Sequence, residues 1–317
     1  ALAMAAAVVI RETIAFVGTE HEKQFIRKAF STYLSGDVVQ EILADPQKLQ
    51  LGGTKRRMTA VFTDIKGFST ISEKLDPEDL VRLLNDYLSS MSNIVLDQKG
   101  TIDKYEGDAI IAFFGAPLEL PDHALRACIS AIAMKRVERE LNIRYEKTGL
   151  SPGPLLTRIG INTGSMVVGN MGTQQKMDYT IMGNAVNLAA RLEGVNKQYG
   201  TWILASEDTV NETGGKIISR RLDRVEVVGI ATPVRLYEIL ELSENAPPGL
   251  STKVELFHHA LDLFESREWA AAETVFGELL SLAPDDAPAK LYHARCGEYR
   301  RKQPGDDWDG VVRLSQK

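Results

Sequence analysis

The chain has 317 residues, of which 44% are hydrophobic and 25% are charged, as in an ordinary globular protein of roughly two domains that can bury a sizeable core. Its formal net charge of −6 argues against a nucleic-acid partner, because phosphate backbones attract basic surfaces. Cys128 and Cys296 form neither a disulfide framework nor a metal-binding spacing, which fits a reducing cytosol.

The N-terminal run from Ala1 to Ile10 is entirely apolar, and Arg11 and Glu12 then interrupt it. Such a run is too short to cross a bilayer, which needs about 20 residues, and no basic segment precedes it as in a signal peptide. We expect residues 1–18 to be a juxtamembrane segment that includes the cytoplasmic end of a transmembrane helix. A sensor domain would lie upstream, and the chain would be a cytoplasmic domain tethered to the inner face of the plasma membrane. The start of a buried helix is the alternative.

Residues 19–53 have the pattern of a helical connector. Apolar side chains recur on one face of the predicted helix at Phe25, Ile26, Ala29, Phe30, Tyr33 and Leu34. A single helix with such a stripe needs a cover. Two alternatives remain for what packs against this stripe: a second copy of the same helix, or the surface of the adjoining domain.

Strands and helices alternate over residues 54–243. The expected elements are a strand at about 58–65, a helix at 77–97, a hairpin turning near Glu106-Gly107, a helix at 121–147, strands at Leu155–Ile161 and Met166–Val168 joined by a turn at Asn162 to Ser165, a helix at 184–198, a strand at 201–204 and a hairpin at 216–240. This order predicts an α+β fold in which helices pack on a mixed sheet.

Residues 244–317 form a predicted helical tail, which the linker Ala246-Pro247-Pro248-Gly249 separates from the preceding domain. The order of tryptophan, alanine, phenylalanine and proline from Trp269 to Pro284 is similar to a tetratricopeptide unit. One such unit is too short to be stable alone, since these repeats usually need about three or more. We therefore favour a tail that caps the preceding domain over a separate peptide-binding array.

Two motifs place an aspartate at the end of an apolar strand. Asp64 follows the first strand, and Asp108 precedes the apolar run Ala109 to Phe114. Taken alone, each is more typical of a turn former or a helix N-cap. At the ends of adjacent buried strands, however, two carboxylates can hold two divalent cations about 3.5–4 Å apart, an arrangement common in phosphoryl chemistry.

A third motif, residues 178–191, predicts a strand end, a turn at Gly183 and a helix. Asn187 and Arg191 are four residues apart and therefore share one helix face. A polar patch facing solvent is the ordinary interpretation of such a pair. Because the neighbouring side chains are mostly apolar, we expect the amide and the guanidinium to face a cleft or a partner.

Four segments, VFTDIKGFS, KYEGDAIIAFFG, RIGINTG and GNAVNLAARLE, occur in an order and spacing that resemble class III nucleotidyl cyclase catalytic domains. The resemblance covers about residues 54–240, and four motifs in register are highly specific. It implies a ferredoxin-like βαββαβ core. It also implies a lyase that converts a nucleoside triphosphate to a cyclic nucleotide and pyrophosphate.

The resemblance assigns the metal ligands to Asp64, Asp108 and the backbone carbonyl of Ile65, with two Mg²⁺ or Mn²⁺ ions in each active site. It assigns Asn187 to the ribose and Arg191 to the charge that develops on the transferred phosphoryl group. The triphosphate would be held by Arg158 and by backbone N–H groups at a helix N-terminus, over Lys66, Gly67, Phe68 and Ser69.

The resemblance also implies that Lys104 and Thr180 contact the base. An ammonium group donates to N1 of adenine, which is an acceptor, whereas N1 of guanine carries a proton. The Thr180 hydroxyl can accept from the adenine amino group. An exposed strand lysine is the ordinary interpretation of Lys104 alone, and the whole motif favours ATP as the substrate.

One segment departs from the family pattern. The family usually has a lysine in a turn near its C-terminal end, whereas this chain has Val227-Val228-Gly229-Ile230 there. The contact to the triphosphate is therefore weakened, unless Arg221, Arg224 or Arg235 replaces the lysine. Loss of one charge-assisted contact should weaken binding more than it abolishes chemistry.

In this family each active site forms between two domains, and this single catalytic domain carries both sets of residues. The resemblance therefore implies a head-to-tail homodimer with equivalent sites. A silent cyclase-like module that only dimerises is the main alternative. A diguanylate cyclase is less consistent with the sequence, because its Gly-Gly-acid-acid-Phe turn is absent.

Overall fold

The computed structural model describes residues 51–227 and 230–314. In chain order its elements are β1 (Gly52–Ile65), α3 (Phe68–Ser72), α4 (Pro77–Asp97), β2 (Thr101–Glu106), β3 (Ala109–Phe114), α5 (His123–Thr148), β4 (Thr157–Gly172), β5 (Met177–Met182), α6 (Asn184–Tyr199), β6 (Ile203–Ser206), α7 (Glu207–Asn211), β7 (Ile217–Val227), β8 (Ile230–Leu242), the 3₁₀ helix η2 (Ser243–Asn245), α8 (Leu250–Glu265), α9 (Trp269–Leu282), α10 (Ala287–Arg301) and β9 (Val311–Leu314). The juxtamembrane segment and nearly all of the connector lie outside the described residues, so the expectations for them stay predictions.

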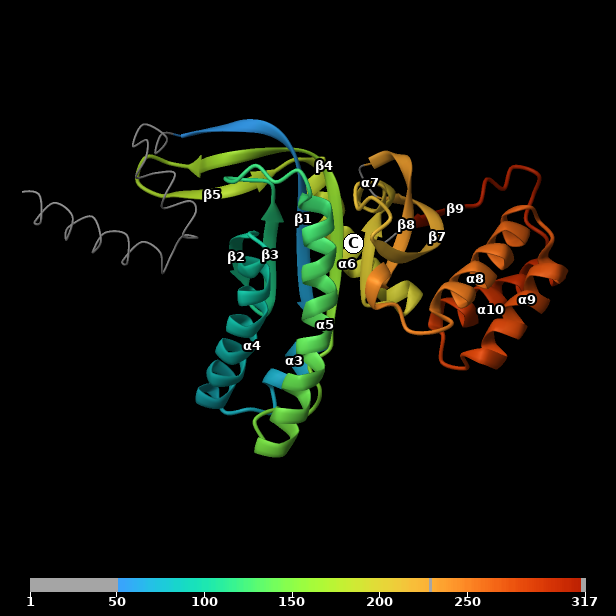
Figure 1. The fold of residues 1–317 in the computed structure, drawn as a ribbon, viewed down its shortest axis with the longest axis horizontal. Coiled ribbons are helices and arrows are strands. Elements are labelled where there is room, and N and C mark those ends of the chain that lie inside the picture. The colour runs from blue at the N-terminus through green and yellow to red at the C-terminus, as the bar shows by residue number, and fades with distance from the viewer. Residues whose placement is uncertain (1–50, 228–229, 315–317) are drawn as a thin grey trace, which may run out of the picture.

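The strands of the described residues form one mixed sheet in the order β2-β3-β1-β4-β6-β8-β7-β9, with β5 paired to β4. The first four strands and the crossover helices α4 and α5 give the βαββαβ order and the strand neighbours of a ferredoxin-like core (Figure 1). Most neighbours are antiparallel, and β4 pairs with β6 in parallel. The predicted α+β fold class is confirmed.

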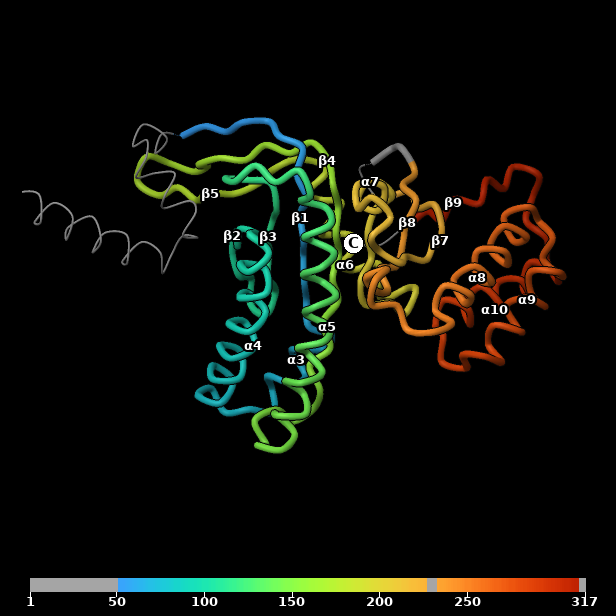
Figure 2. The backbone as a smooth tube through the Cα atoms, viewed as in Figure 1, coloured from blue at the N-terminus to red at the C-terminus, as the bar shows by residue number. Residues whose placement is uncertain are grey.

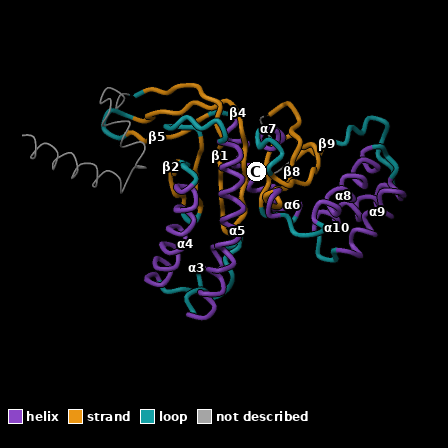
Figure 3. The backbone as a smooth tube through the Cα atoms, viewed as in Figure 1, coloured by secondary structure: helices purple, strands orange, loops and turns teal. Residues whose placement is uncertain are grey.

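Helices cover both faces of the sheet, as the purple helices around the orange strands show in Figure 3. Helices α4 and α5 pack on one face, where Val61 and Ile65 of β1 are buried. Met58 and Ala60 of β1 are buried on the other face, against α6. Because side chains alternate along a strand, Asp64 points to the same face as Ala60, the face that α6 covers.

Strand β4 is continuous, so the prediction of two strands joined by a turn at Asn162 to Ser165 is wrong. Asn162 and Thr163 in this segment are buried, and both side chains are hydrogen-bonded. Thr163 and Thr59 share a hydrogen bond of 2.7 Å between their hydroxyls, and the Asn162 amide donates to the carbonyl of Ala185 at 2.7 Å. Because partners on β1 and α6 replace water, the polar sequence does not end the strand.

The β4–β5 hairpin and the start of β1 extend beyond the helices as an arm, which is easily followed at the top of the tube in Figure 2. Thr180 lies on this arm, in β5. Strand β5 therefore lies outside the part of the sheet that the helices cover, and it contacts the edge strand β2.

The three tail helices α8, α9 and α10 pack against the sheet and α6 and share one apolar core with them (Figure 1). Phe257, Phe276 and Tyr292 of the tail are fully buried and make edge-to-face or stacked ring contacts. Arg295 of α10 forms an ion pair of 2.5 Å with the buried Asp223 of β7, to which the Tyr199 hydroxyl of α6 also donates at 2.7 Å. This packing favours the cap over a separate array.

Replacing Phe257 with alanine is expected to lower the free energy of unfolding by about 3–5 kcal/mol, because a buried aromatic ring is removed from a shared core. Urea unfolding followed by circular dichroism would measure the change. Leu282→Ala, in a side chain of the same tail that is 62% exposed, is the control and should change little. Two separate unfolding transitions, of which Phe257→Ala shifts only the smaller, would contradict a shared core.

No helix in the described part of the chain combines the length and the apolar character needed to cross a membrane.

Candidate active site

Asp64 and Asp108 meet where β1 ends and β3 begins. Asp64 is the penultimate residue of β1, and Asp108 lies in the tight turn between β2 and β3, where Gly107 has a φ of 65°. The backbone N–H of Ile65 donates to Oδ2 of Asp108 at 2.9 Å. A glycine at the turn permits this left-handed conformation, which brings the second carboxylate to the end of the first strand.

Burial raises the pKa of both carboxyls, and the charge of Asp64 raises the pKa of Asp108 further. Lys197 and Arg158 act in the opposite direction and lower the pKa of Asp64. Two half-buried carboxylates that repel each other favour a bound cation, and their hard oxygen atoms suit Mg²⁺ or Mn²⁺. The residues present therefore fit the predicted pair of divalent cations.

The described residues contain no cluster of three His, Cys, Asp or Glu side chains arranged to hold a metal. Backbone, water and nucleotide oxygens remain as the other ligands for cations at Asp64 and Asp108, in keeping with the few protein ligands that Mg²⁺ takes beside a phosphate. The assignment of the Ile65 carbonyl as a ligand stays a prediction.

Glu193 of α6 is a third carboxylate in this region, and the sequence analysis did not select it. Burial first, and then the charge of Asp64, raises its pKa to about 7. Its Oε1 atom is buried and has no hydrogen-bond partner among the described residues. Lys197, one turn further along α6, lowers the pKa of Glu193 as it does that of Asp64. Glu193 and Lys197 thus belong to the electrostatic surroundings of Asp64 and Asp108.

Asn187 and Arg191 project from a different face of α6. At 100° per residue, the Asn187–Arg191 pair and the Glu193–Lys197 pair lie on well-separated sides of the helix. Asn187 is exposed and Arg191 is partly exposed. Within the part of the chain that the structure describes, no hydrogen bond or ion pair engages the Arg191 guanidinium. The helix thus presents one pair toward Asp64 of its own chain and leaves the other pair open.

The predicted base contacts, Lys104 of β2 and Thr180 of β5, come together in space although 76 residues separate them. Nζ of Lys104 donates to Oγ1 of Thr180 at 3.3 Å. Asp103, which the sequence analysis also missed, accepts a hydrogen bond of 2.6 Å from the Thr180 hydroxyl and lies 3.3 Å from Nζ of Lys104. An ammonium, a hydroxyl and a buried carboxylate therefore form one polar group at the base of the arm.

Arg158 lies directly across from Asp64 in the pairing of β4 with β1. Arg158 therefore belongs to the same end of the sheet as Asp64 and Asp108, which is consistent with its predicted contact to a triphosphate. The predicted phosphate loop begins one residue after Ile65 and leads into α3, which Gly67 precedes with a φ of 69°. Lys66 of this loop is exposed, and its ammonium lies 5.9 Å from the centre of the Trp202 ring.

The three arginines considered as replacements for the missing lysine all contact the tail. Arg221 pairs with Asp262, Arg235 pairs with Glu265, and the Arg224 guanidinium donates to the carbonyl of Asp309 at 2.8 Å. These contacts tie the arginines to the cap and lend no support to a role at the triphosphate. The turn itself falls partly on residues 228–229, outside the described residues.

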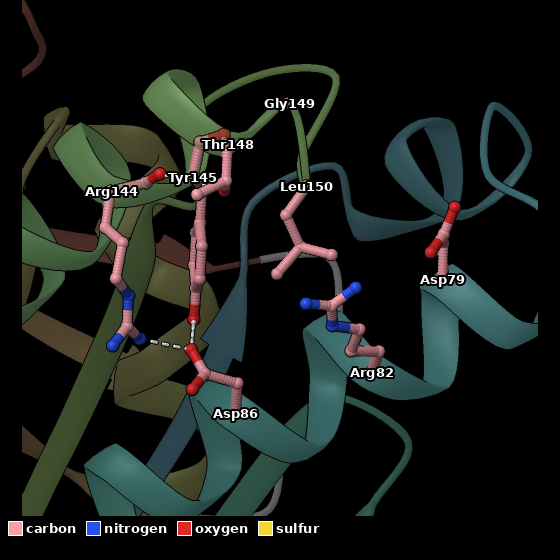
Figure 4. Close-up of a pocket in the computed structure, with 8 residues that line it drawn as sticks. All are labelled: Asp79, Arg82, Asp86, Arg144, Tyr145, Thr148, Gly149 and Leu150. Atoms are coloured by element: carbon pink, nitrogen blue, oxygen red, sulfur yellow. Dashed lines mark hydrogen bonds and ion pairs between the residues drawn. The ribbon is translucent and has the colours of Figure 1, made fainter.

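A separate hollow of about 380 Å³ lies between α4 and α5 (Figure 4). Asp86 is its central acid, accepting a hydrogen bond of 2.6 Å from the Tyr145 hydroxyl and pairing with Arg144. None of the predicted site residues lines this hollow. The candidate active site lies elsewhere, at the ends of β1 and β3, the arm and α6.

Comparisons with known proteins identify the family of this chain. The family model for the adenylate and guanylate cyclase catalytic domain matches residues 53–239. Adenylate cyclase 1 of Rhizobium meliloti (strain 1021) is 35% identical over 211 residues, which cover 67% of this chain and 31% of that protein. This chain therefore belongs to the adenylate and guanylate cyclase catalytic domain family. It spans about a third of the length of this curated relative, so the activity of a whole protein is not carried over from it.

Solved structures of both base specificities are similar to this chain. The adenylyl cyclase CyaB from P. aeruginosa has a TM-score of 0.57 at 37% identity, covering 62% of this chain and 100% of that one. The guanylyl cyclase Cya2 has a TM-score of 0.55 at 35% identity, covering 62% of this chain and 97% of that one. Because the two similarities are nearly equal, the choice of base has to be argued from the residues at the site.

Proposed function

We propose that residues 54–243 are an adenylate cyclase domain that converts ATP to 3′,5′-cyclic AMP and pyrophosphate. The observation that carries this proposal is the hydrogen-bonded group of Lys104, Thr180 and Asp103. The ammonium offers a donor for N1 of adenine and would meet the N1 proton of guanine unfavourably. The Thr180 oxygen offers an acceptor for the adenine amino group.

In the reaction, the ribose 3′-oxygen forms a bond to the α-phosphorus, the bond from that phosphorus to the bridging oxygen breaks, and the hydroxyl proton is lost. Bound Mg²⁺ or Mn²⁺ at Asp64 and Asp108 would acidify the 3′-hydroxyl and neutralise the triphosphate. Arg158 would hold the triphosphate from the neighbouring strand, with the backbone N–H groups of residues 66–69. Asn187 would orient the ribose, and Arg191 would neutralise charge that develops on the transferred group.

We further propose that the active sites form between two copies of this chain in a head-to-tail homodimer. The support comes from α6, which turns Lys197 toward Asp64 of its own chain and leaves Arg191 without a partner on another face. A two-fold pair of chains would bring Asn187 and Arg191 of one copy to Asp64 and Asp108 of the other. Two equivalent sites would result, as two-fold symmetry requires.

The remaining parts of the proposal rest on the sequence. Residues 244–317 would be a tail with one tetratricopeptide-like unit, which serves as a cap. The apolar run from Ala1 to Ile10 would tether the domain to the cytoplasmic side of a membrane, below a sensor. Fractionation of cells that express the domain together with its upstream segment, or residues 19–317 alone, tests the tether: only the longer form should sediment with membranes.

A silent dimerising module is the second candidate, and the turn at Val227–Ile230 favours it because no basic residue occurs there. One assay decides between the two candidates. Purified protein is given ATP or GTP with Mg²⁺ or Mn²⁺, and the cyclic product is identified by mass spectrometry. Cyclic AMP from ATP supports the cyclase. Absence of any cyclic product with both metals supports the silent module, and preferential use of GTP contradicts the base assignment.

Changing Lys104 to glutamate and Thr180 to cysteine is expected to lower kcat/KM for ATP by about 10- to 100-fold, because a charge-assisted hydrogen bond to the base is lost. Steady-state assays with ATP and GTP would measure the change. Lys104→Met is the companion variant, since it removes the ammonium without placing a second carboxylate beside Asp103. Unchanged kcat/KM for ATP in all of these variants would mean that the two residues do not contact the base.

A further inference from the structure

Asp103 occupies a bulge in β2. In the pairing of β2 with β3, Ile102 faces Ala112 and Lys104 faces Ile111, so Asp103 is the extra residue without a partner in the ladder. In a regular strand, Asp103 and Lys104 would point to opposite faces. The bulge re-aims one of them, and both side chains reach the same residue, Thr180.

The Asp103 carboxylate contacts both predicted base-contact residues. Its side chain is 2% exposed, and Oδ2 accepts from the Thr180 hydroxyl at 2.6 Å. Oδ1 forms an ion pair of 3.3 Å with Nζ of Lys104 and makes no hydrogen bond to the described residues. The Lys104 side chain, in contrast, is 40% exposed and can reach a ligand.

These contacts fix the direction of the Thr180 hydroxyl. A hydroxyl has a single proton to donate, and a carboxylate can only accept. With its proton committed to Asp103, the Thr180 oxygen presents only lone pairs to its other neighbours, one of which is the Lys104 ammonium. In water a threonine hydroxyl can both donate and accept hydrogen bonds. At this site the Thr180 hydroxyl can only accept from a ligand.

We propose that Asp103 is a positioning residue for base selection, which makes Thr180 an obligate acceptor and holds Lys104 as the adjacent donor. This inference rests on the proposed cyclase function and adds a residue to it. An acceptor at Thr180 matches the exocyclic amino group of adenine and opposes the carbonyl oxygen at the same place on guanine. The Asp103 side chain is 2% exposed, so it acts through its two neighbours.

The test replaces Asp103 with asparagine, which keeps the shape of the side chain but can donate to the Thr180 hydroxyl through its amide. The hydroxyl proton is then free to face the nucleotide. We expect the ratio of kcat/KM for ATP to that for GTP to fall about tenfold, through KM more than kcat, with a matching fall in the ratio of binding affinities measured by displacement of a fluorescent ATP analogue. Asp97→Asn, an exposed carboxylate at the end of α4, is the control and should leave the ratio unchanged.

A double-mutant cycle with Thr180→Val separates positioning from general damage. Valine has the shape of threonine without the hydroxyl, so Asp103→Asn should change the ratio much less in the Thr180→Val background. An equal change in both backgrounds, or an unchanged ratio in the single variant, would overturn the inference. If Asp103→Asn does not fold, Asp103→Ala is measured in its place, with the same expected loss of selectivity.

The binding measurements keep this inference distinct from the proposed function. A wild-type chain that makes no cyclic nucleotide would refute the cyclase, and the ratio of ATP to GTP affinities would still report on Asp103. A wild-type chain that turns over ATP, with a ratio that Asp103→Asn does not change, would refute the role of Asp103 alone.

Discussion

Replacing either Asp64 or Asp108 with asparagine is expected to lower ATP turnover by about 10³-fold or more while the fold is retained. Each change removes one anionic oxygen ligand and keeps the shape of the side chain, and a divalent cation in such a site contributes several kcal/mol to stabilisation of the transition state. Cyclic AMP formation at saturating Mn²⁺ is the measurement. Asp97→Asn has the same change in charge at an exposed position and should retain full activity.

Thermal stability distinguishes loss of a metal ligand from misfolding. Burial raises the pKa of both carboxyls, so ionisation at neutral pH destabilises the metal-free fold, and this cost grows as pH rises through the folded-state pKa. The neutral variants should therefore unfold at the same temperature as the wild type or slightly higher. Added Mn²⁺ should stabilise the wild type and have less effect on the variants. Near wild-type activity in both variants would refute the metal assignment.

The strongly patterned elements of the fold are the ones that the sequence predicted well. Helix α4 has the bounds Pro77–Asp97 that its apolar periodicity and its initial proline indicated. The prediction was wrong at β4, where Asn162 and Thr163 are typical of a turn. Their hydrogen bonds to α6 and β1 are contacts between distant segments, and no local pattern contains them.

The residues of the candidate site also include some that the sequence predicted and some that it did not. Asp64 and Asp108 were selectable because their motifs stand at strand ends, whereas Lys104 and Thr180 were assigned by the family resemblance. The structure brings each pair together. Asp103 was missed because period-two alternation assigns it to the opposite face from Lys104, and the bulge that reverses this assignment is a property of the pairing with β3.

Glu193 was missed for a related reason. The helix periodicity that joined Asn187 to Arg191 assigns Glu193 to another face of the helix, and no motif marks that face. In the structure that other face points to Asp64 of the same chain. A helix that serves two sites, one in its own chain and one in a partner, would use both faces, and this possibility leads to a direct test of the shared site.

Mixing an inactive Asp64→Asn chain with an inactive Arg191→Ala chain is expected to restore activity. In the mixed dimer, Asp64 and Asp108 of the second chain meet Asn187 and Arg191 of the first, so one of the two sites is intact. If the subunits exchange freely at equal concentrations, half of the dimers are mixed, and about a quarter of the wild-type activity should return. Cyclic AMP formation before and after mixing would measure the recovery.

The control is a mixture of Asp64→Asn with Asp108→Asn. Both substitutions affect the metal carboxylates, so every site in every dimer of this mixture lacks one of them, and no activity should return. Recovery in the first mixture but not in the second would assign Arg191 and the metal carboxylates of one site to different chains. If differently tagged subunits are shown to exchange and the first mixture stays inactive, Arg191 and Asp64 do not meet across the dimer, and the open face of α6 has another role.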